Sequence, residues 1–151
     1  MPYTYDYPRP MLTVDAAVFR KLTDNFELLL IQRKNYPFEG MWALPGGFVD
    51  MDETCEEAVI RELEEETHLK MEKLEQLHTF STLGRDPRGR TVSVTFYGMA
   101  DPKKSDVKGG DDAGDARWFT MDDLPPLAFD HIEVVKMAWE KIQNQNSKNQ
   151  K

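Results

Sequence analysis

The chain contains few of the features that several large classes of protein require. Its single cysteine, Cys55, cannot form an internal disulfide, which favours a reducing compartment such as the cytoplasm. The sequence has no apolar run near the ~20 residues that a membrane-spanning helix needs, and its first residues lack a secretory signal pattern. Basic residues are also few, 19 against 27 acidic, and the net charge of −8 argues against a nucleic-acid-binding surface.

What is present predicts one globular domain. A length of 151 residues, with 40% hydrophobic and 30% charged residues, is enough for a single hydrophobic core. We expect this domain to occupy residues 1–142 and the polar segment 143–151 to be a disordered tail. Strands are expected at 11–19, 27–32, 74–81, 91–99 and 117–120, and helices at 54–67 and 130–144. Mixed strands with two separated helices indicate an α/β sandwich.

Three glutamates in the first expected helix point to a metal site. Glu62 is three residues before Glu65 and four before Glu66, so the three side chains lie on one helical face. Like charges on one face repel, and a purely structural helix has little reason to gather them. A divalent cation removes the repulsion, and Mg²⁺ prefers carboxylate oxygens completed by water and substrate phosphates. The spacing therefore indicates a catalytic metal site rather than a solvated surface.

The same segment resembles the Nudix box, the signature of Mg²⁺-dependent hydrolases of nucleoside diphosphates linked to another group. The matching positions are Gly47, Glu53, Arg61, Glu62, Leu63, Glu65, Glu66 and Leu69, all at the spacing of the box. The resemblance implies a three-layer α/β/α sandwich around a mixed β-sheet. It also implies that Glu62, Glu65 and Glu66 bind Mg²⁺, with Mn²⁺ as the alternative metal, together with the backbone carbonyl of Gly46.

Other catalytic roles follow from the resemblance as well. Glu65 and Glu62 are expected to be catalytic, with Arg61 and Glu53 orienting the catalytic glutamates. Many Nudix enzymes place a further acid, a ligand or general base, on a loop before an aromatic strand. In this chain that loop is 110–115, where Asp112 is the first candidate and Asp111 the second. A glycine-rich acidic turn without a catalytic role is the equal alternative.

One position departs from the box, because His68 stands where the family has its second glycine. That glycine follows the helix end, where a residue with positive φ commonly closes the last turn. Histidine adopts positive φ at a cost that glycine avoids. We therefore interpret His68 as a helix cap, with an additional metal ligand as the alternative.

Two further segments resemble the ADP-ribose pyrophosphatase branch of the family. One is the turn 80–90, which carries Arg85, Arg88 and Arg90, and the other is 127–131, with Phe129 and His131. Guanidinium groups pair well with phosphate, so the arginines are candidates for substrate binding, as are Phe129 and His131. A solvent-exposed turn is the alternative for the arginines. Candidates for stacking on a base are Tyr36, Phe38, Trp42 and Phe129.

The leading functional hypothesis is hydrolysis of ADP-ribose to AMP and ribose 5-phosphate. A second keeps the chemistry but changes the substrate to another nucleotide sugar, a dinucleotide or an oxidised nucleotide. A third is a non-catalytic ADP-ribose-sensing domain, like those of regulators that carry an additional C-terminal DNA-binding domain. We expect no such domain here, because the sequence ends about nine polar residues after the last expected helix, and the intact acidic box favours catalysis. The resemblance makes a homodimer the expected assembly, with no nucleic-acid or membrane partner.

Overall fold

Seven strands form a single mixed sheet in the computed structural model, which describes residues 2–110 and 113–149. The strands are β1 (Met11–Lys21), β2 (Phe26–Arg33), β3 (Trp42–Ala43), β4 (Gly46–Phe48), β5 (Glu75–Phe80), β6 (Thr91–Met99) and β7 (Ala113–Thr120). The helices are α1 (Cys55–Thr67), the short 3₁₀ helix η1 (Pro102–Lys104) and α2 (His131–Asn149).

The main path of the sheet runs in the order β3-β2-β1-β6-β5. β1 and β6 pair in parallel, whereas β1–β2, β2–β7 and β5–β6 are antiparallel, which makes the sheet mixed as expected. β4 leaves this path and pairs antiparallel with the first half of β1, so that Gly46 lies opposite Asp15. This short pairing places the beginning of the Nudix box beside β1, the middle strand of the main path.

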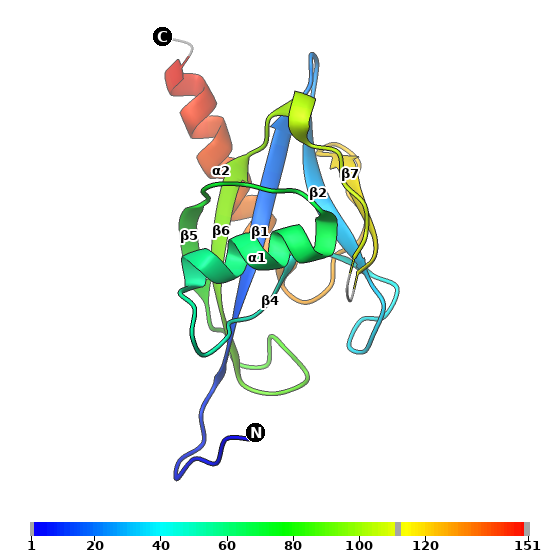
Figure 1. Cartoon of the computed structure of the whole chain (residues 1–151). Coiled ribbons are helices and arrows are strands. Elements are labelled where there is room, and N and C mark those ends of the chain that lie inside the picture. Colours follow the sequence, from blue (N-terminus) through cyan, green and yellow to red (C-terminus); the bar gives the residue numbers. More distant parts are fainter. Residues whose placement is uncertain (1, 111–112, 150–151) are drawn as a thin grey trace.

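The two long helices cover opposite faces of the sheet, as Figure 1 shows. Alternate residues of a strand point to opposite faces. Val14, Ala16 and Val18 of β1 therefore pack with the α1 side chains Val59 and Leu63. On the other face, the neighbouring strand residues pack with the buried residues of α2. The expected α/β/α sandwich is confirmed.

The sequence prediction differs from the structure in three places. β3 and β4 were not expected. They are only two and three residues long and lie beside a proline and two glycines, so they show no alternation of polar and apolar residues. β7 begins at Ala113, four residues before the expected strand. The expected disordered tail 143–151 is wrong as far as Asn149, because α2 continues there and Gln145 donates a hydrogen bond to the Tyr97 hydroxyl (2.9 Å). Among the described residues, the helices lack the length and apolar character to cross a membrane.

Candidate active site

Local sequence determines where α1 begins and which way it faces. Thr54 caps the helix: its hydroxyl accepts a hydrogen bond from the Glu57 N–H (3.1 Å), and the Glu57 carboxylate accepts one from the Thr54 N–H (3.0 Å). This reciprocal pair is a capping box, and it satisfies two N–H groups that the first turn leaves free. The buried stripe, which includes Val59 and Leu63, holds α1 on the sheet. The orientation turns Glu62 and Glu66 towards β4.

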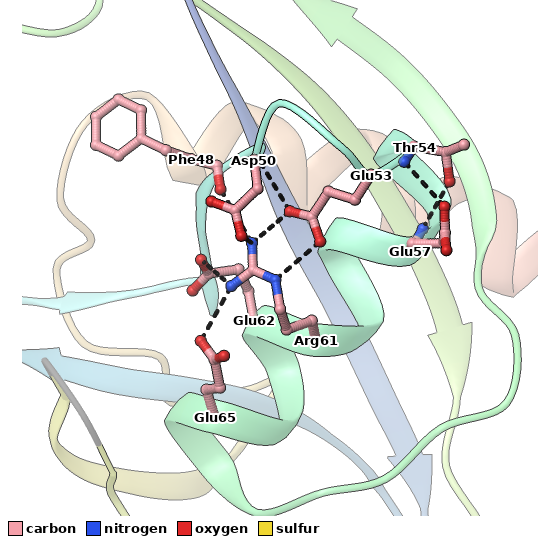
Figure 2. Close-up of polar contacts among 8 residues, drawn as sticks. All are labelled: Phe48, Asp50, Glu53, Thr54, Glu57, Arg61, Glu62 and Glu65. Atoms are coloured by element: carbon pink, nitrogen blue, oxygen red, sulfur yellow. Dashed lines mark hydrogen bonds and ion pairs between the residues drawn. The ribbon is translucent and has the colours of Figure 1, made fainter. Parts of the chain in front are cut away.

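Arg61 lies at the centre of a cluster of carboxylates (Figure 2). Its guanidinium donates two hydrogen bonds to Glu53 (2.5 and 2.9 Å), one to Glu62 (2.9 Å) and one to Glu65 (3.0 Å). A further bond to the Phe48 carbonyl (3.2 Å) ties the cluster to β4. The hydrogen bonds that Glu53 accepts from Arg61 lower the pKa of Glu53 below its ordinary value. Arg61 thus contacts Glu62 and Glu65, the glutamates that it is expected to orient, while Glu53 holds Arg61.

The two glycines of β4 lie directly against the glutamates of α1. The Gly46 N–H donates to a carboxylate oxygen of Glu66 (2.7 Å). A Cβ atom on Gly47 would lie 2.5 Å from the carboxyl carbon of Glu62, so a side chain there would displace the Glu62 carboxylate. Burial, together with the neighbouring charges of Glu62 and Asp15, raises the pKa of Glu66 to about 8, although the Gly46 N–H and the charge of Arg33 act in the opposite direction. Burial also raises the pKa of Glu62.

A cleft of about 330 Å³ lies beside these glutamates. Its lining includes an acidic wall from α1 and β4, a basic and aromatic group that we call the basic wall, and two buried polar side chains. Among the lining residues are Gly46, Gly47, Glu62, Glu65 and Glu66 in the acidic wall, Arg33, Tyr36, Arg85, Arg88 and Phe129 in the basic wall, and the buried pair Asp15 and His131.

The basic wall is organised around the ring of Phe129. The Arg33 guanidinium lies 5.0 Å and the Arg88 guanidinium 5.7 Å from the centre of this ring, and Arg88 also lies 5.2 Å from that of Phe48. Arg88 donates two side-chain hydrogen bonds to Asp86, which hold its guanidinium against the cleft. The two arginines and the ring form a surface suited to an anionic and aromatic ligand.

Only some of the predicted substrate-binding residues line the cleft. Arg85 lines the cleft but is only 4% exposed, because it donates two hydrogen bonds to Asp130 (2.6 and 3.0 Å). Arg90 lies outside the cleft and donates to the Ser81 carbonyl (2.7 Å). Trp42 also lies outside it and packs edge-on against Phe119, so the prediction that it reaches the substrate site finds no support in the cleft geometry.

Asp15 and Arg33 are among the charged residues of the cleft that sequence reasoning missed. Asp15 is a carboxylate in the middle of the apolar strand β1, and that exception to the pattern is the signal that identifies it. Burial alone would raise the pKa of Asp15, but His131, the Ser93 hydroxyl and the charge of Arg85 lower it below the ordinary value. Arg33 ends β2, and nothing in its local sequence distinguishes it from a surface arginine.

The loop before β7 approaches the C-terminal end of α1. The Gly110 N–H donates to the Glu66 carbonyl (3.1 Å), and the Lys108 N–H donates to the Thr67 carbonyl (3.0 Å). Asp111 and the predicted catalytic Asp112 lie outside the described residues. His68 closes α1 with φ 62°, and its N–H donates to the Glu64 carbonyl (2.8 Å), which confirms the predicted cap.

With this geometry established, comparisons with known proteins identify the family. The model of the NUDIX domain matches residues 10–138. The chain belongs to the Nudix family. It is 45% identical over 135 residues to the ADP-ribose pyrophosphatase of Methanocaldococcus jannaschii, an alignment that covers 88% of this chain and 76% of the relative.

A transcriptional repressor and a NUDIX domain solved with ADP ribose are also similar to this chain. The ADPR responsive transcriptional repressor NtrR of Acinetobacter baylyi is 35% identical over 92% of the chain, which spans only 57% of the repressor. The NUDIX domain of Shewanella oneidensis NrtR, solved in complex with ADP ribose, superimposes with a TM-score of 0.85 at 36% identity, covering 91% of this chain and 94% of that domain.

The donor chemistry of the Nudix box suits a divalent cation. Three carboxylates lie within about one turn of α1. Burial raises the pKa of Glu62 and Glu66 because a charged carboxylate is unfavourable there, and a neighbouring cation would offset that unfavourable free energy. Their side chains are turned to other partners: Glu62 and Glu65 to Arg61, and Glu66 to the Gly46 N–H. Accordingly, no three Asp, Glu, His or Cys side chains among the described residues are arranged to hold a metal ion.

Proposed function

We propose that this Nudix protein hydrolyses ADP-ribose to AMP and ribose 5-phosphate. The observation that carries the proposal is one cleft whose lining includes both the carboxylates of the Nudix box and the arginines Arg85 and Arg88. Hydrolysis of a pyrophosphate needs charge neutralisation and positioning more than covalent chemistry, and these two walls supply both. Similarity to an ADP-ribose pyrophosphatase and to a NUDIX domain solved with ADP ribose supports the choice of substrate.

A divalent cation belongs to this proposal, with Mg²⁺ first and Mn²⁺ second. Glu62, Glu65 and Glu66 would hold it, together with the carbonyl of Gly46. The bound cation would polarise the phosphoryl oxygens and lower the pKa of a coordinated water. Arg61 contributes by holding Glu62 and Glu65 on one side of the cleft, since its guanidinium contacts both carboxylates.

The basic wall would receive the anionic and aromatic parts of the substrate. Arg88 is 31% exposed and lies beside Phe129, so it can contact a phosphate or ribose oxygen while a base stacks nearby. Arg85 is held by Asp130 and contributes mainly positive charge to the cleft. Glu65 and Asp112 are the candidates for the general base that activates water.

The proposal is tested by AMP release from a panel of nucleoside diphosphate derivatives in the presence of Mg²⁺. The panel contains ADP-ribose, another nucleotide sugar, a dinucleotide and an oxidised nucleoside triphosphate, compared by kcat/KM. ADP-ribose is expected to give the highest kcat/KM. A tenfold preference for another member would replace the substrate but keep the chemistry.

A non-catalytic ADP-ribose-sensing domain is the second candidate, favoured by the similarity to the ADPR responsive transcriptional repressor of Acinetobacter baylyi. Calorimetric titration distinguishes the two functions. A sensor binds ADP-ribose at micromolar concentration with or without Mg²⁺ and releases no AMP. The enzyme releases AMP only when a divalent cation is present.

We also propose a homodimer as the working assembly. Large apolar side chains that are exposed in the single chain support it, among them Tyr7, Met51 and Leu83. The single cysteine supports the cytoplasm as the compartment.

A further inference from the structure

The segment that leads into α2 runs beside the strand that opens the Nudix box. The Ala128 N–H donates to the Trp42 carbonyl (2.8 Å), and Trp42 and Leu127 form an isolated parallel bridge. Three residues further, the Leu44 N–H donates to Nδ1 of His131 (3.0 Å). Two parts of the chain that are almost 90 residues apart are thus joined where the catalytic segment begins.

The hydrogen bond that His131 accepts indicates which ring nitrogen carries the proton. A ring nitrogen that accepts a hydrogen bond carries no proton, so the ring N–H of His131 is on Nε2 in this arrangement. Nε2 lies 3.5 Å from a carboxylate oxygen of Asp15, whose other oxygen accepts a hydrogen bond from the Ser93 hydroxyl (2.5 Å). Asp15 therefore favours the tautomer that leaves Nδ1 free to accept from Leu44.

The hydrogen bond between Leu44 and His131 affects the position of Gly46 relative to the Glu66 carboxylate. Leu44 is only 2% exposed, so its N–H has no access to bulk water and depends on His131. Two residues later, the Gly46 N–H donates to Glu66. Pro45 stiffens the short connection between the two, because its ring restricts φ. A shift of the Leu44 backbone would therefore move Gly46 relative to Glu66.

We propose that His131 is a positioning residue that holds segment 44–47, and through it the Gly46–Glu66 contact, for hydrolysis. This role rests on the proposed function and replaces the direct substrate contact expected from the sequence. Both ring nitrogens face protein groups, His131 is only 4% exposed, and the Phe129 ring lies 5.2 Å from the imidazole. A ligand in the cleft meets Phe129 and Arg88 before it meets His131.

Two substitutions separate the bonds that His131 makes. His131→Asn retains an acceptor oxygen near the position of Nδ1, so it can still receive the Leu44 N–H, but it loses the group facing Asp15. His131→Gln retains a polar group near the position of Nε2 and leaves the buried Leu44 N–H without its acceptor. The pair differs in the contact with Leu44, and thermal unfolding of both variants shows whether they are folded.

The expected result is a difference in kcat between the two variants. His131→Gln should lower kcat for ADP-ribose at least ~10-fold, since a misplacement of about 1 Å in a catalytic group can cost ~100-fold. KM should change less than ~3-fold, because substrate contacts remain. His131→Asn should recover most of kcat. Mn²⁺ affinity, measured by calorimetry without substrate, should fall in His131→Gln and recover in His131→Asn.

Amide hydrogen exchange supplies a readout that does not depend on activity. The Leu44 and Gly46 amides should exchange at least ~10-fold faster in His131→Gln than in His131→Asn. In His131→Gln the Leu44 N–H loses its acceptor, and the Gly46 N–H is then no longer held in place by the Leu44 backbone. Unchanged Gly46 exchange and unchanged kcat in a folded His131→Gln protein would overturn the proposal. A higher KM in both variants at constant kcat would also overturn it, in favour of substrate contact. If the parent protein releases no AMP, the proposed function fails, and amide exchange still decides the role of His131.

Discussion

Glu65 is the most exposed of the three box glutamates, and Arg61 is its partner in the structure. Replacing Glu65 by glutamine keeps the shape but removes one negative charge from a helical face that also carries Glu62 and Glu66. We expect Glu65→Gln to unfold at the same temperature as the parent or higher, because repulsion falls. Hydrolysis should drop at least ~100-fold, since electrostatic stabilisation is a large share of phosphoryl-transfer catalysis.

Glu64→Gln is the matched control for this experiment. Glu64 is the preceding residue of α1, is exposed and lies outside the cleft. The same change of charge there should leave kcat/KM within ~2-fold. Turnover of the Glu65→Gln protein within a few-fold of the parent would show that Glu65 is a surface residue.

Arg88 and Arg90 form a second pair at the residue scale, because only Arg88 reaches the cleft. An arginine that contacts a substrate anion contributes a charge-assisted hydrogen bond, worth roughly 1.5–3 kcal/mol. Arg88→Ala should therefore lower kcat/KM for ADP-ribose by roughly 10- to 100-fold, at ~1.4 kcal/mol per decade. Arg90→Ala should stay within ~3-fold, since its hydrogen bond to Ser81 lies elsewhere. Equal activity of both alanine variants would exclude Arg88 from substrate binding.

At the scale of elements, the end of α1 carries local strain. His68 has φ 62°, a region that costs other residues energy and costs glycine none. His68→Gly should therefore stabilise the protein by up to ~1 kcal/mol, measured by chemical denaturation. Mg²⁺ affinity should not change, because His68 is exposed and lies outside the cleft. A large loss of Mg²⁺ affinity would instead identify His68 as a ligand.

The connection between β5 and β6 gives a prediction for acid stability. Burial alone would raise the pKa of Asp86, but the hydrogen bonds and charge of Arg88, with the charge of Arg85, lower it below the usual 3.8. The unfolded chain therefore takes up this proton at a higher pH than the folded protein does. The resulting stability is complete above about pH 4 and is lost as the pH falls towards the folded pKa.

Chemical denaturation between pH 6 and pH 2 tests this prediction against Asp86→Asn. The variant should be less stable than the parent at pH 6, and the difference should shrink as the pH falls below 3.8. A difference that stays constant down to pH 2 would mean that the Asp86 carboxylate contributes nothing through its charge.

At the scale of the whole molecule, the proposed homodimer can be tested directly by measuring the mass of the protein in solution. The N-terminal segment 2–10 is exposed and extends away from the sheet, as Figure 1 shows, and it carries three tyrosines. Burial of exposed apolar side chains drives association. Sedimentation equilibrium at micromolar concentration should therefore give twice the chain mass of 17.5 kDa. A mass of one chain across that range would contradict the homodimer.

The sequence alone determined what depends on near neighbours in the chain. The capping box at Thr54, the buried stripe of α1 and the positive φ of His68 were all predictable, because a helix brings together residues one to four apart. The same rule gathered Glu62, Glu65 and Glu66 on one face. Strand alternation likewise predicted β1, β2, β5 and β6 to within about two residues.

Only the tertiary structure decided which distant residues meet. Arg88 lines the cleft and Arg90 does not, although the two are separated by one residue, because the turn points their side chains to different partners. Asp15 and His131 come together across the sheet, where no local pattern relates them. Such contacts depend on strand order and on the position of α2, which arise from packing over the entire core and carry no periodic signal in the sequence.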